Sequence, residues 1–305
     1  MKQNLSPVKK THFGIARKIV SNMTSESWES IPHAVVTYEP ECSKFLSVVS
    51  EINKAATKET KLTINTIMLR VIVEGLKACP ALNAHIDFNR KLVRGKITQF
   101  KEINISMPML LNNGEMMTIN LHNMHQKSIS QMQDTIKDAQ RRANNSDMNE
   151  VMYDVSFDNT IQGLKEGKIL QTIHRLYGSK TGKHKVTVLK GEARKKYYSI
   201  PEKDRLTKHD IEQGTITVSN LGSIYRDWDG VCTLLEIIPP QVAAVAIGAV
   251  QLVPVAHEDG TVTTGKKMPL TIAFDHRALD MGDIVPFMKR LDEIFENPEI
   301  IKEWI

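Results

Sequence analysis

Apolar side chains recur every three to four residues along several stretches of the chain, the spacing at which they share one face of a helix. These stretches predict helices over 12–23, 43–57, 63–79, 128–142 and 281–295. Thr63 is a suitable N-cap for the third helix, and Pro80 ends it because proline cannot continue a helix. The Ser-rich stretch at Ser25 is expected to end the first helix.

Shorter runs of β-branched and aromatic residues predict strands. They lie at 34–38, 84–88, 91–93, 103–111, 116–121, 214–219, 242–250, 253–257, 262–264 and 267–274. Turn-forming residues at Asn89-Arg90, Asn112-Asn113-Gly114 and Asp259-Gly260 join neighbouring runs and predict hairpins. Strands and helices do not alternate regularly, so the pattern indicates an α+β fold in which helices cover a mixed sheet.

The stretch from about 154 to 204 has weak periodicity, and a helix is expected there from either Met148 or Asn159. It is rich in cations: Lys180, Lys183, Lys185, Lys190, Arg194, Lys195 and Lys196. Such a segment either faces an acidic partner or is simply a solvated surface. The net charge of the chain is only +5 and the aromatic residues are few, which argues against a nucleic-acid-binding protein.

With 305 residues, 41% of them hydrophobic, the chain can bury a core as one domain spanning 1–305. The longest apolar run, 242–250, is too short to cross a bilayer, and the N-terminus lacks the apolar stretch of a secretion signal. We therefore expect a cytoplasmic protein without membrane contact. Its three cysteines are scattered and odd in number, which predicts neither a disulfide framework nor a metal site.

The most informative chemistry lies after the last predicted strand. His276 follows the strand directly, Asp280 comes four residues later, and Gly282 follows. This spacing places a titratable base at the edge of a sheet, with an acid able to hold its loop. The spacing alone allows two interpretations, a catalytic base or a structural histidine in a turn.

Residues 275–282 resemble the D-H-R-x-x-D-G motif of the acyltransferase components of 2-oxo-acid dehydrogenase complexes, and the H-x-x-x-D-G motif of chloramphenicol acetyltransferases. Residues 214–222, Gly-Thr-Ile-Thr-Val-Ser-Asn-Leu-Gly, are similar to the G-T-F-T-I-S-N-L-G of the former family. Further similarities follow in the family's order at 17–18, 31–33, 80–84, 238–241 and 246–248. The resemblance covers nearly the whole chain except about 154–204, which looks like a basic insertion.

The resemblance implies a chloramphenicol acetyltransferase-like fold and an acyltransferase that uses coenzyme A as a substrate, without a metal. It implies that His276 is the general base, that the hydroxyl of Ser219 stabilises the tetrahedral oxyanion, and that Asp280 supports the histidine loop. In the family that support includes a salt bridge to an arginine of the first helix, for which Arg17 is the candidate. Transfer is direct, without an acyl-enzyme.

The resemblance also implies a homotrimer in which His276 of one chain faces Ser219 of its neighbour. In the family a C-terminal hydrophobic anchor joins trimers into larger cages. Residues 300–305 are apolar enough for this role, although they can equally pack on their own subunit.

Three departures from the family pattern bear on function. The glycine after the acid is displaced to Gly282, which predicts a reshaped loop behind His276. Methionines between 107 and 117 line the expected substrate wall, which leaves the acyl group open. We expect no lipoyl or peripheral-subunit-binding domain before the core, and therefore no covalent lipoyl group on this chain and a separate lipoyl or acyl carrier protein as its partner.

The sequence leaves two other functions open. The first is a small-molecule O- or N-acetyltransferase acting on an antibiotic or metabolite, for which the core alone suffices. The second is a non-catalytic trimeric scaffold, against which the joint presence of His276, Ser219 and Asp280 argues. The preferred hypothesis is acyl transfer between coenzyme A and dihydrolipoamide.

Overall fold

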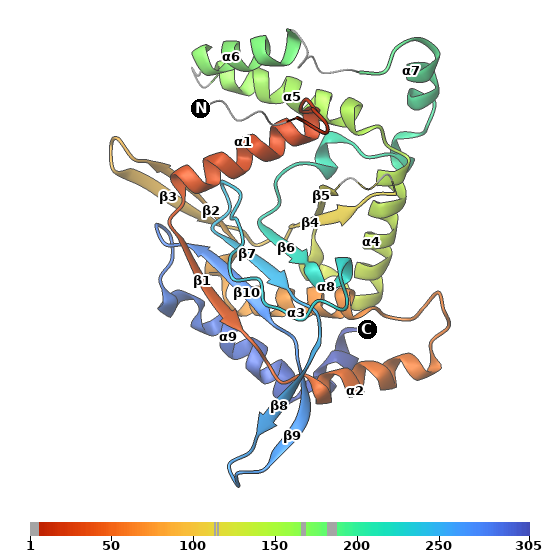
Figure 1. The fold of residues 1–305 in the computed structure, drawn as a ribbon, viewed down its shortest axis with the longest axis vertical. Helices are drawn as coiled ribbons and strands as arrows, with labels where there is room; N and C mark the ends of the chain where they lie inside the picture. The colour runs from red at the N-terminus through yellow and green to blue at the C-terminus, as the bar shows by residue number, and fades with distance from the viewer. Residues whose placement is uncertain (1–5, 113, 115, 166–168, 182–187) are drawn as a thin grey trace.

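A six-stranded mixed sheet lies at the centre of the computed structural model, which describes residues 6–112, 114, 116–165, 169–181 and 188–305 (Figure 1). Across the sheet the strands follow the order β1 (His33–Tyr38), β10 (Leu270–Asp275), β7 (Ala243–Ile247), β6 (Ile216–Asn220), β4 (Ile105–Leu110) and β5 (Met116–Leu121). β6 runs parallel to β4 and β7, and the other pairs are antiparallel. The predicted mixed sheet is confirmed.

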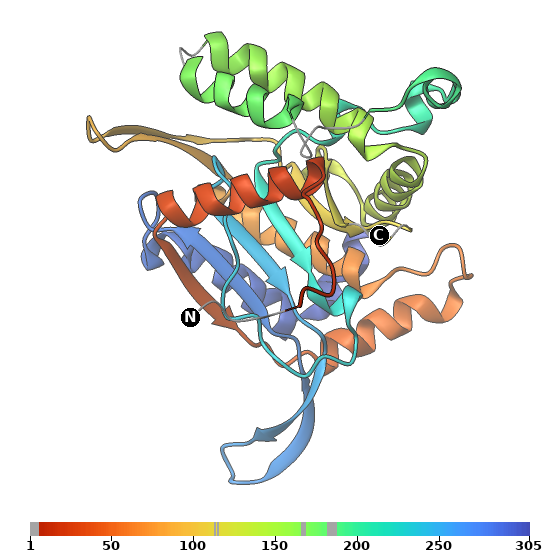
Figure 2. The same ribbon diagram turned by 45° about the horizontal axis from the view of Figure 1, so that its top comes forward.

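Helices pack against this sheet, as the α+β prediction expects. They are α1 (Ile15–Ser30), α2 (Ser43–Ile52), α3 (Ile64–Ala78), α4 (Ile129–Asn144), α5 (Met148–Lys165), α6 (Ile169–Lys180), α7 (Gly191–Tyr198), α8 (Leu221–Ile224) and α9 (Met281–Glu296). In both views α3 and α9 lie behind the sheet, while α1 crosses in front of it and α5 and α6 lie beyond α1 (Figures 1 and 2). No helix of the described ranges is long and apolar enough to cross a membrane.

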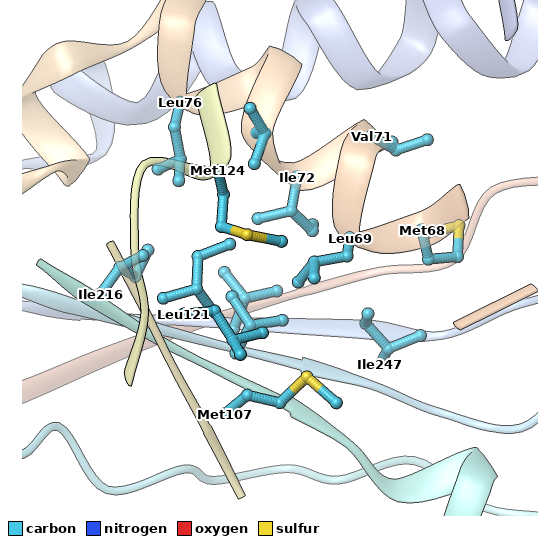
Figure 3. Packing of buried hydrophobic residues seen from close by; sticks show 14 of the residues in the cluster. Met68, Leu69, Val71, Ile72, Leu76, Met107, Leu121, Met124, Ile216 and Ile247 are labelled. Atoms are coloured by element: carbon cyan, nitrogen blue, oxygen red, sulfur yellow. The ribbon is translucent and has the colours of Figure 1, made fainter. Parts of the chain in front are cut away.

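The core fills the space between α3 and the sheet (Figure 3). The i, i+3, i+4 spacing of Met68, Leu69, Ile72 and Leu76 puts them on the inner face of α3, where each is no more than 1% exposed. Facing them are Leu121, Ile216 and Ile247 of the strands. Burial of this continuous apolar layer drives the chain to fold around the sheet.

One helix contact predicts a measurable stability effect. A Cβ added at Gly75 of α3 would lie 2.6 Å from the ring of Phe287 and 2.8 Å from Leu291, both on α9. Because Phe287 is fully buried and its ring must shift to accommodate the methyl group, Gly75→Ala should lower the free energy of unfolding by about 1–3 kcal/mol in a denaturant titration. Gly282→Ala is the control, since no atom lies within 4 Å of the added methyl. Equal stability of the two variants would contradict the prediction.

The first helix differs from its prediction. α1 ends at Ser30, seven residues beyond the expected end at Met23. Serine normally favours helix ends, but Ser27 is fully buried and its hydroxyl donates to the Ile237 carbonyl at 2.7 Å. A tertiary contact therefore overrides the local preference of the Ser-rich stretch.

Two hairpins project from the body of the molecule. One consists of β2 (Ala84–Asn89) and β3 (Arg94–Gln99), and the other of β8 (Gln251–Ala256) and β9 (Val262–Lys267). Figure 1 shows them as two arms extending from different ends of the sheet. Both hairpins were expected, and the structure confirms the β8–β9 hairpin around Asp259-Gly260. In the β2–β3 hairpin the turn spans 90–93 and the second strand begins at Arg94, so the strand predicted at 91–93 was wrong. The β2–β3 hairpin also contacts the loop that carries His276, through Phe88 and Arg277.

The cationic segment forms helices α5, α6 and α7, with α5 beginning at Met148. Among its predicted cations, Lys183 and Lys185 lie outside the described residues. The return of this segment to the sheet is tied to α4 by two ion pairs, Arg141 to Asp204 at 2.8 Å and Arg142 to Asp210 at 2.7 Å. These contacts anchor the segment on the core at its C-terminal side.

The C-terminal residues pack on their own subunit. A 3₁₀ helix spans Pro298–Trp304, in which Ile301 is fully buried and Trp304 is 8% exposed. The guanidinium of Arg70 lies 5.4 Å from the centre of the Trp304 ring. The structure thus shows the packing on the same subunit that the sequence allows.

Candidate active site

The loop after β10 fixes the position and the tautomer of the His276 ring. Its backbone N–H donates to the Pro32 carbonyl at 3.0 Å, which fixes the residue beside the start of β1. The ring Nδ1 lies 3.1 Å from the Leu279 carbonyl and 3.2 Å from Oδ1 of Asp280. Both neighbours are acceptors, so Nδ1 carries the proton and Nε2 presents a lone pair. The side chain is 55% exposed, and Nε2 makes no hydrogen bond within the described part of the chain.

Asp280 is placed by the helix that follows it. It is the N-cap residue of α9, and its backbone N–H donates to Oδ2 of Asp283 at 2.8 Å. The first helical position is Met281, which is 50% exposed, and a Cβ on Gly282 would meet open space. The displaced glycine therefore leaves an ordinary helix start, and the carboxylate of Asp280 reaches back to His276.

The expected salt bridge between Arg17 and Asp280 is not formed in this chain. The C-terminal end of α1 leads to Pro32, beside His276, whereas Arg17 lies 13 residues before the last residue of α1. At 1.5 Å per residue this separation is about 20 Å. Arg17 is exposed at the far end of the helix, because α1 runs away from the histidine loop rather than across it.

A buried ion pair next to His276 was not assigned a role from the sequence. Asp275 is completely buried, and Arg277 binds its two carboxylate oxygens through Nε and Nη2 at 3.0 and 2.6 Å. The signal was present, since an acid and an arginine directly flank the histidine. Only the structure shows that the two side chains turn inward and pair while His276 turns outward.

Ser219 lies in β6 and is 8% exposed. Its hydroxyl makes no hydrogen bond to any residue that the structure describes, and it is not a buried unsatisfied atom. It therefore remains available as a donor. The next residue, Asn220, closes the strand by accepting from the Ser223 N–H at 2.8 Å and donating to Asn65 at 2.7 Å.

His276 and Ser219 do not meet within one chain. Ser219 pairs with Ala246 near the end of β7, whereas Asp275, just before His276, donates to the Val242 carbonyl at its start. His276 and Ser219 therefore lie beside positions of β7 that are five residues apart. Along the strand direction this separation is roughly 16 Å. The two strands also have β7 between them, so the two side chains cannot act on one bond in the same subunit.

The glycines of the 214–222 motif serve close packing of the backbone. A Cβ on Gly214 would lie 2.5 Å from the Asn104 carbonyl oxygen, and one on Gly222 would lie 2.7 Å from that of Gly248. Only glycine permits these approaches. The motif thus seats β6 and the turn after Ser219 tightly against their neighbours.

Two histidines support the loops around His276. His33 accepts the N–H of Ile237 at Nε2 and donates from Nδ1 to the Ile31 carbonyl, at 3.1 and 2.9 Å, so backbone groups occupy both of its ring nitrogens. Burial lowers the pKa of His85 below its usual value near 6.5, and its Nε2 donates to the Gly214 carbonyl at 3.0 Å. Both rings are structural donors or acceptors rather than free bases.

The methionines of β4 do not form an open substrate wall in this chain. Met107 and Met109 are only 7% and 5% exposed and belong to the core, where Figure 3 shows Met107 beside the sheet. Met116 of β5 is 44% exposed. The alternation of the strand turns these β4 side chains inward, which a mixed apolar sequence does not reveal.

Two hollows among the described residues are lined by neither His276 nor Ser219. The larger, about 460 Å³, lies between α2 and the end of α9 and is lined by Lys44, Glu51 and Glu296 among others. The smaller, about 230 Å³, lies near the C-terminus. No group of His, Cys, Asp and Glu suited to a metal ion occurs in the described ranges.

Comparison with known proteins gives a consistent result. The family model of the 2-oxoacid dehydrogenases acyltransferase (catalytic domain) matches residues 7–156 and 192–302. The unmatched residues 157–191 fall within the stretch where we predict an insertion. A curated relative, the dihydrolipoyllysine-residue acetyltransferase component of the mitochondrial pyruvate dehydrogenase complex of Saccharomyces cerevisiae, is 24% identical over 287 residues. The alignment covers 92% of this chain but only 45% of that protein, so the chain spans less than half of its length.

Solved structures share the fold. The cubic core of the pyruvate dehydrogenase multienzyme complex aligns with a TM-score of 0.66 at 15% identity, covering 98% of this chain and 96% of that one. The dihydrolipoamide acetyltransferase of Azotobacter vinelandii aligns with a TM-score of 0.63 at 16% identity and the same coverage. At these identities the likeness concerns the α+β fold. Because the family model matches most of the chain, the protein belongs to the 2-oxoacid dehydrogenases acyltransferase (catalytic domain) family.

Proposed function

We propose that this protein transfers an acyl group between coenzyme A and the thiol of dihydrolipoamide, with His276 as general base. The observation that carries the proposal is the state of the imidazole. Nδ1 donates to the Leu279 carbonyl and lies 3.2 Å from Oδ1 of Asp280, which leaves Nε2 as an exposed proton acceptor. Membership of an acyltransferase family and the name of the yeast relative support the choice of reaction and of acceptor.

The chemistry follows from this geometry. Nε2 removes the proton from the incoming thiol, and the resulting thiolate attacks the carbonyl carbon of the acyl thioester. The tetrahedral intermediate carries an oxyanion, to which the hydroxyl of Ser219 donates a hydrogen bond. Collapse breaks the original carbon–sulfur bond, and the departing thiolate takes back the proton from the imidazolium. Two bound thiols thus exchange one acyl group without an acyl-enzyme.

The Azotobacter enzyme offers a parallel for these roles. Its structural and enzymatic study concerned a serine, a histidine and an asparagine four residues after the histidine. In this chain Asp280 follows His276 at the same spacing. We assign His276, Ser219 and Asp280 by this parallel and by the motif resemblance.

A complete site in this scheme requires a second subunit. Since the register holds Ser219 roughly 16 Å from His276 along the strands, the serine that serves a given histidine comes from a neighbouring copy. We propose a homotrimer, which closes three equivalent interfaces of this head-to-tail kind. A separate carrier protein is the proposed source of the lipoyl group.

A thiol-release assay tests the function. Purified protein is given a panel of acyl-CoA donors with dihydrolipoamide, small amines or small alcohols as acceptors. Turnover with dihydrolipoamide that is lost in His276→Ala and kept in His257→Ala supports the proposal; His257 is an exposed histidine of the β8–β9 arm. Turnover with amines or alcohols alone would mean a small-molecule acetyltransferase. A folded trimer inactive with every acceptor would indicate a scaffold.

Asp280→Asn should have a mild effect. The Leu279 carbonyl also accepts from Nδ1, and an asparagine oxygen can replace the carboxylate as the second acceptor. The change is worth about one hydrogen bond, so kcat/KM should fall by less than about tenfold in steady-state assays. A loss beyond about a hundredfold would show that the negative charge itself is required.

A further inference from the structure

Asp275 is a buried carboxylate for which the proposed reaction has no use. It ends β10, immediately before His276, and its side chain is 0% exposed. A charge in this position is stable only when it is paired and fully hydrogen-bonded. Arg277 supplies the pairing: its Nε lies 3.0 and 3.1 Å from the two oxygens, and its Nη2 lies 2.6 Å from Oδ2.

The same aspartate closes the backbone turn around His276. Oδ1 accepts the backbone N–H of Arg277 at 2.9 Å. The Asp275 carbonyl accepts the N–H groups of Ala278 and Leu279 at 2.9 and 3.0 Å. Leu279 then turns its own carbonyl to Nδ1 of His276 at 3.1 Å. A continuous set of bonds therefore connects the buried carboxylate to the ring that presents Nε2.

Arg277 links this turn to a second element. Its guanidinium carbon lies 5.7 Å from the centre of the Phe88 ring, on the β2–β3 hairpin. The arginine side chain is 22% exposed, so most of it is enclosed between the turn and the hairpin. Because the guanidinium is planar, it can bind the carboxylate with its edge and the ring with its face.

We infer that Asp275 and Arg277 form a positioning pair that holds His276 in its reactive orientation and tautomer. The pair does not touch the reacting atoms. It fixes the turn whose Leu279 carbonyl selects Nδ1–H, and the contact with Phe88 braces Arg277 from the hairpin side. This inference rests on the proposed function, since it assumes that Nε2 of His276 is the working base.

The test uses two substitutions in the pair, Asp275→Asn and Arg277→Lys, and one control substitution in a similar ion pair away from the site. Asparagine keeps the shape of Asp275 but not its charge, and lysine keeps the charge of Arg277 but cannot bind both oxygens in a fork. Asp210→Asn is the control because Asp210 and its partner Arg142 are 9% and 20% exposed, close to the values for the pair at the site. All variants are assayed at a temperature at which circular dichroism shows them fully folded.

The expected result is a loss in kcat with little change in KM. A small displacement of a catalytic group slows reaction by about a hundredfold, so Asp275→Asn should lose about that factor in kcat. Arg277→Lys should lose less, and Asp210→Asn should keep the kcat of the unchanged protein. If Asp275→Asn keeps kcat within about threefold, or if Asp210→Asn loses as much, the positioning role is refuted.

NMR of the ring nitrogens tests the positioning role without relying on acyl-transfer activity. In the unchanged protein the ¹⁵N shifts of His276, assigned by their absence in His276→Ala, should report a single Nδ1–H tautomer at a pH where the ring is neutral. In Asp275→Asn they should report a mixture of tautomers. An unchanged single tautomer would overturn the positioning role even in a protein with full activity. A wild-type protein without acyltransferase activity would refute the proposed function, while the tautomer measurement would still decide the role of the pair.

Discussion

Replacing His276 by alanine is expected to slow acyl transfer by about 10²- to 10⁴-fold, the usual contribution of a positioned general base. The thiol of coenzyme A or dihydrolipoamide then has no acceptor for its proton, because Nε2 is the free acceptor that the turn presents. Dissociation of the thiol into water can still supply some thiolate, so the loss should be large but incomplete. Steady-state kinetics with both substrates varied would place the loss in kcat.

The same change should leave the fold intact. The His276 side chain is 55% exposed, and its ring centroid lies 6.1 Å from that of Phe274. Substitutions at such exposed positions usually change the free energy of unfolding by no more than about 0.5 kcal/mol. Thermal unfolding followed by circular dichroism checks this. An active His276→Ala protein, slowed less than about tenfold, would remove the histidine from the mechanism.

Ser219→Ala is expected to slow the reaction by about 10²- to 10³-fold, since it removes one donor to the oxyanion. The sharper result comes from mixing this variant with His276→Ala. In trimers of one variant alone, every site lacks either the histidine or the serine. In mixed trimers, however, some interfaces combine the intact histidine of one subunit with the intact serine of its neighbour.

Random mixing of equal amounts should restore activity at about a quarter of the sites, because each interface draws one subunit of the right type on each side. The two proteins are unfolded together and refolded, or co-expressed with different tags and purified through both. Separately refolded samples mixed afterwards are the control and should stay inactive. Absence of any recovery in verified mixed trimers would show that the two residues do not share a site.

The register of the sheet is the reason for this expectation. β10 and β7 are antiparallel, whereas β7 and β6 are parallel, so the end of β10 and the end of β6 lie at opposite ends of β7. His276 follows one and Ser219 lies in the other. No rotation of side chains can close a gap of roughly 16 Å along the strands. Only a neighbouring subunit can bring a second Ser219 to His276.

Local sequence signals were sufficient for the secondary structure wherever they were strong. The helical spacing in 63–79 and 281–295 predicted α3 and α9, and the turn residues Asp259-Gly260 predicted the β8–β9 arm. At the β2–β3 arm the hairpin was predicted, but its second strand begins at Arg94 and not at residue 91. The prediction was poorer where a distant contact decides the outcome. The Ser-rich end of α1 stays helical because Ser27 finds a buried acceptor on Ile237, 210 residues away.

In the candidate site, too, local contacts were predicted from the sequence and distant contacts were not. The motif around His276 is contiguous in sequence, and its His276–Asp280 contact spans a single turn, so spacing alone brings the two together. The predicted salt bridge of Arg17 depended on the direction of a whole helix. α1 places Arg17 about 20 Å from the histidine loop. The prediction that Met107 lines an open wall failed because that face of β4 packs on the core.

By itself the sequence determined the family and the α+β class and singled out His276 as the candidate base, because these follow from contiguous patterns of apolar spacing, turns and motif residues. The tertiary structure decided which neighbours those residues meet. Burial of Asp275 against Arg277, the tautomer set by Leu279 and the separation of His276 from Ser219 all arise from strand register and packing between distant segments. Such contacts are chosen by the free energy of the assembled core, and no local window of the chain contains that information.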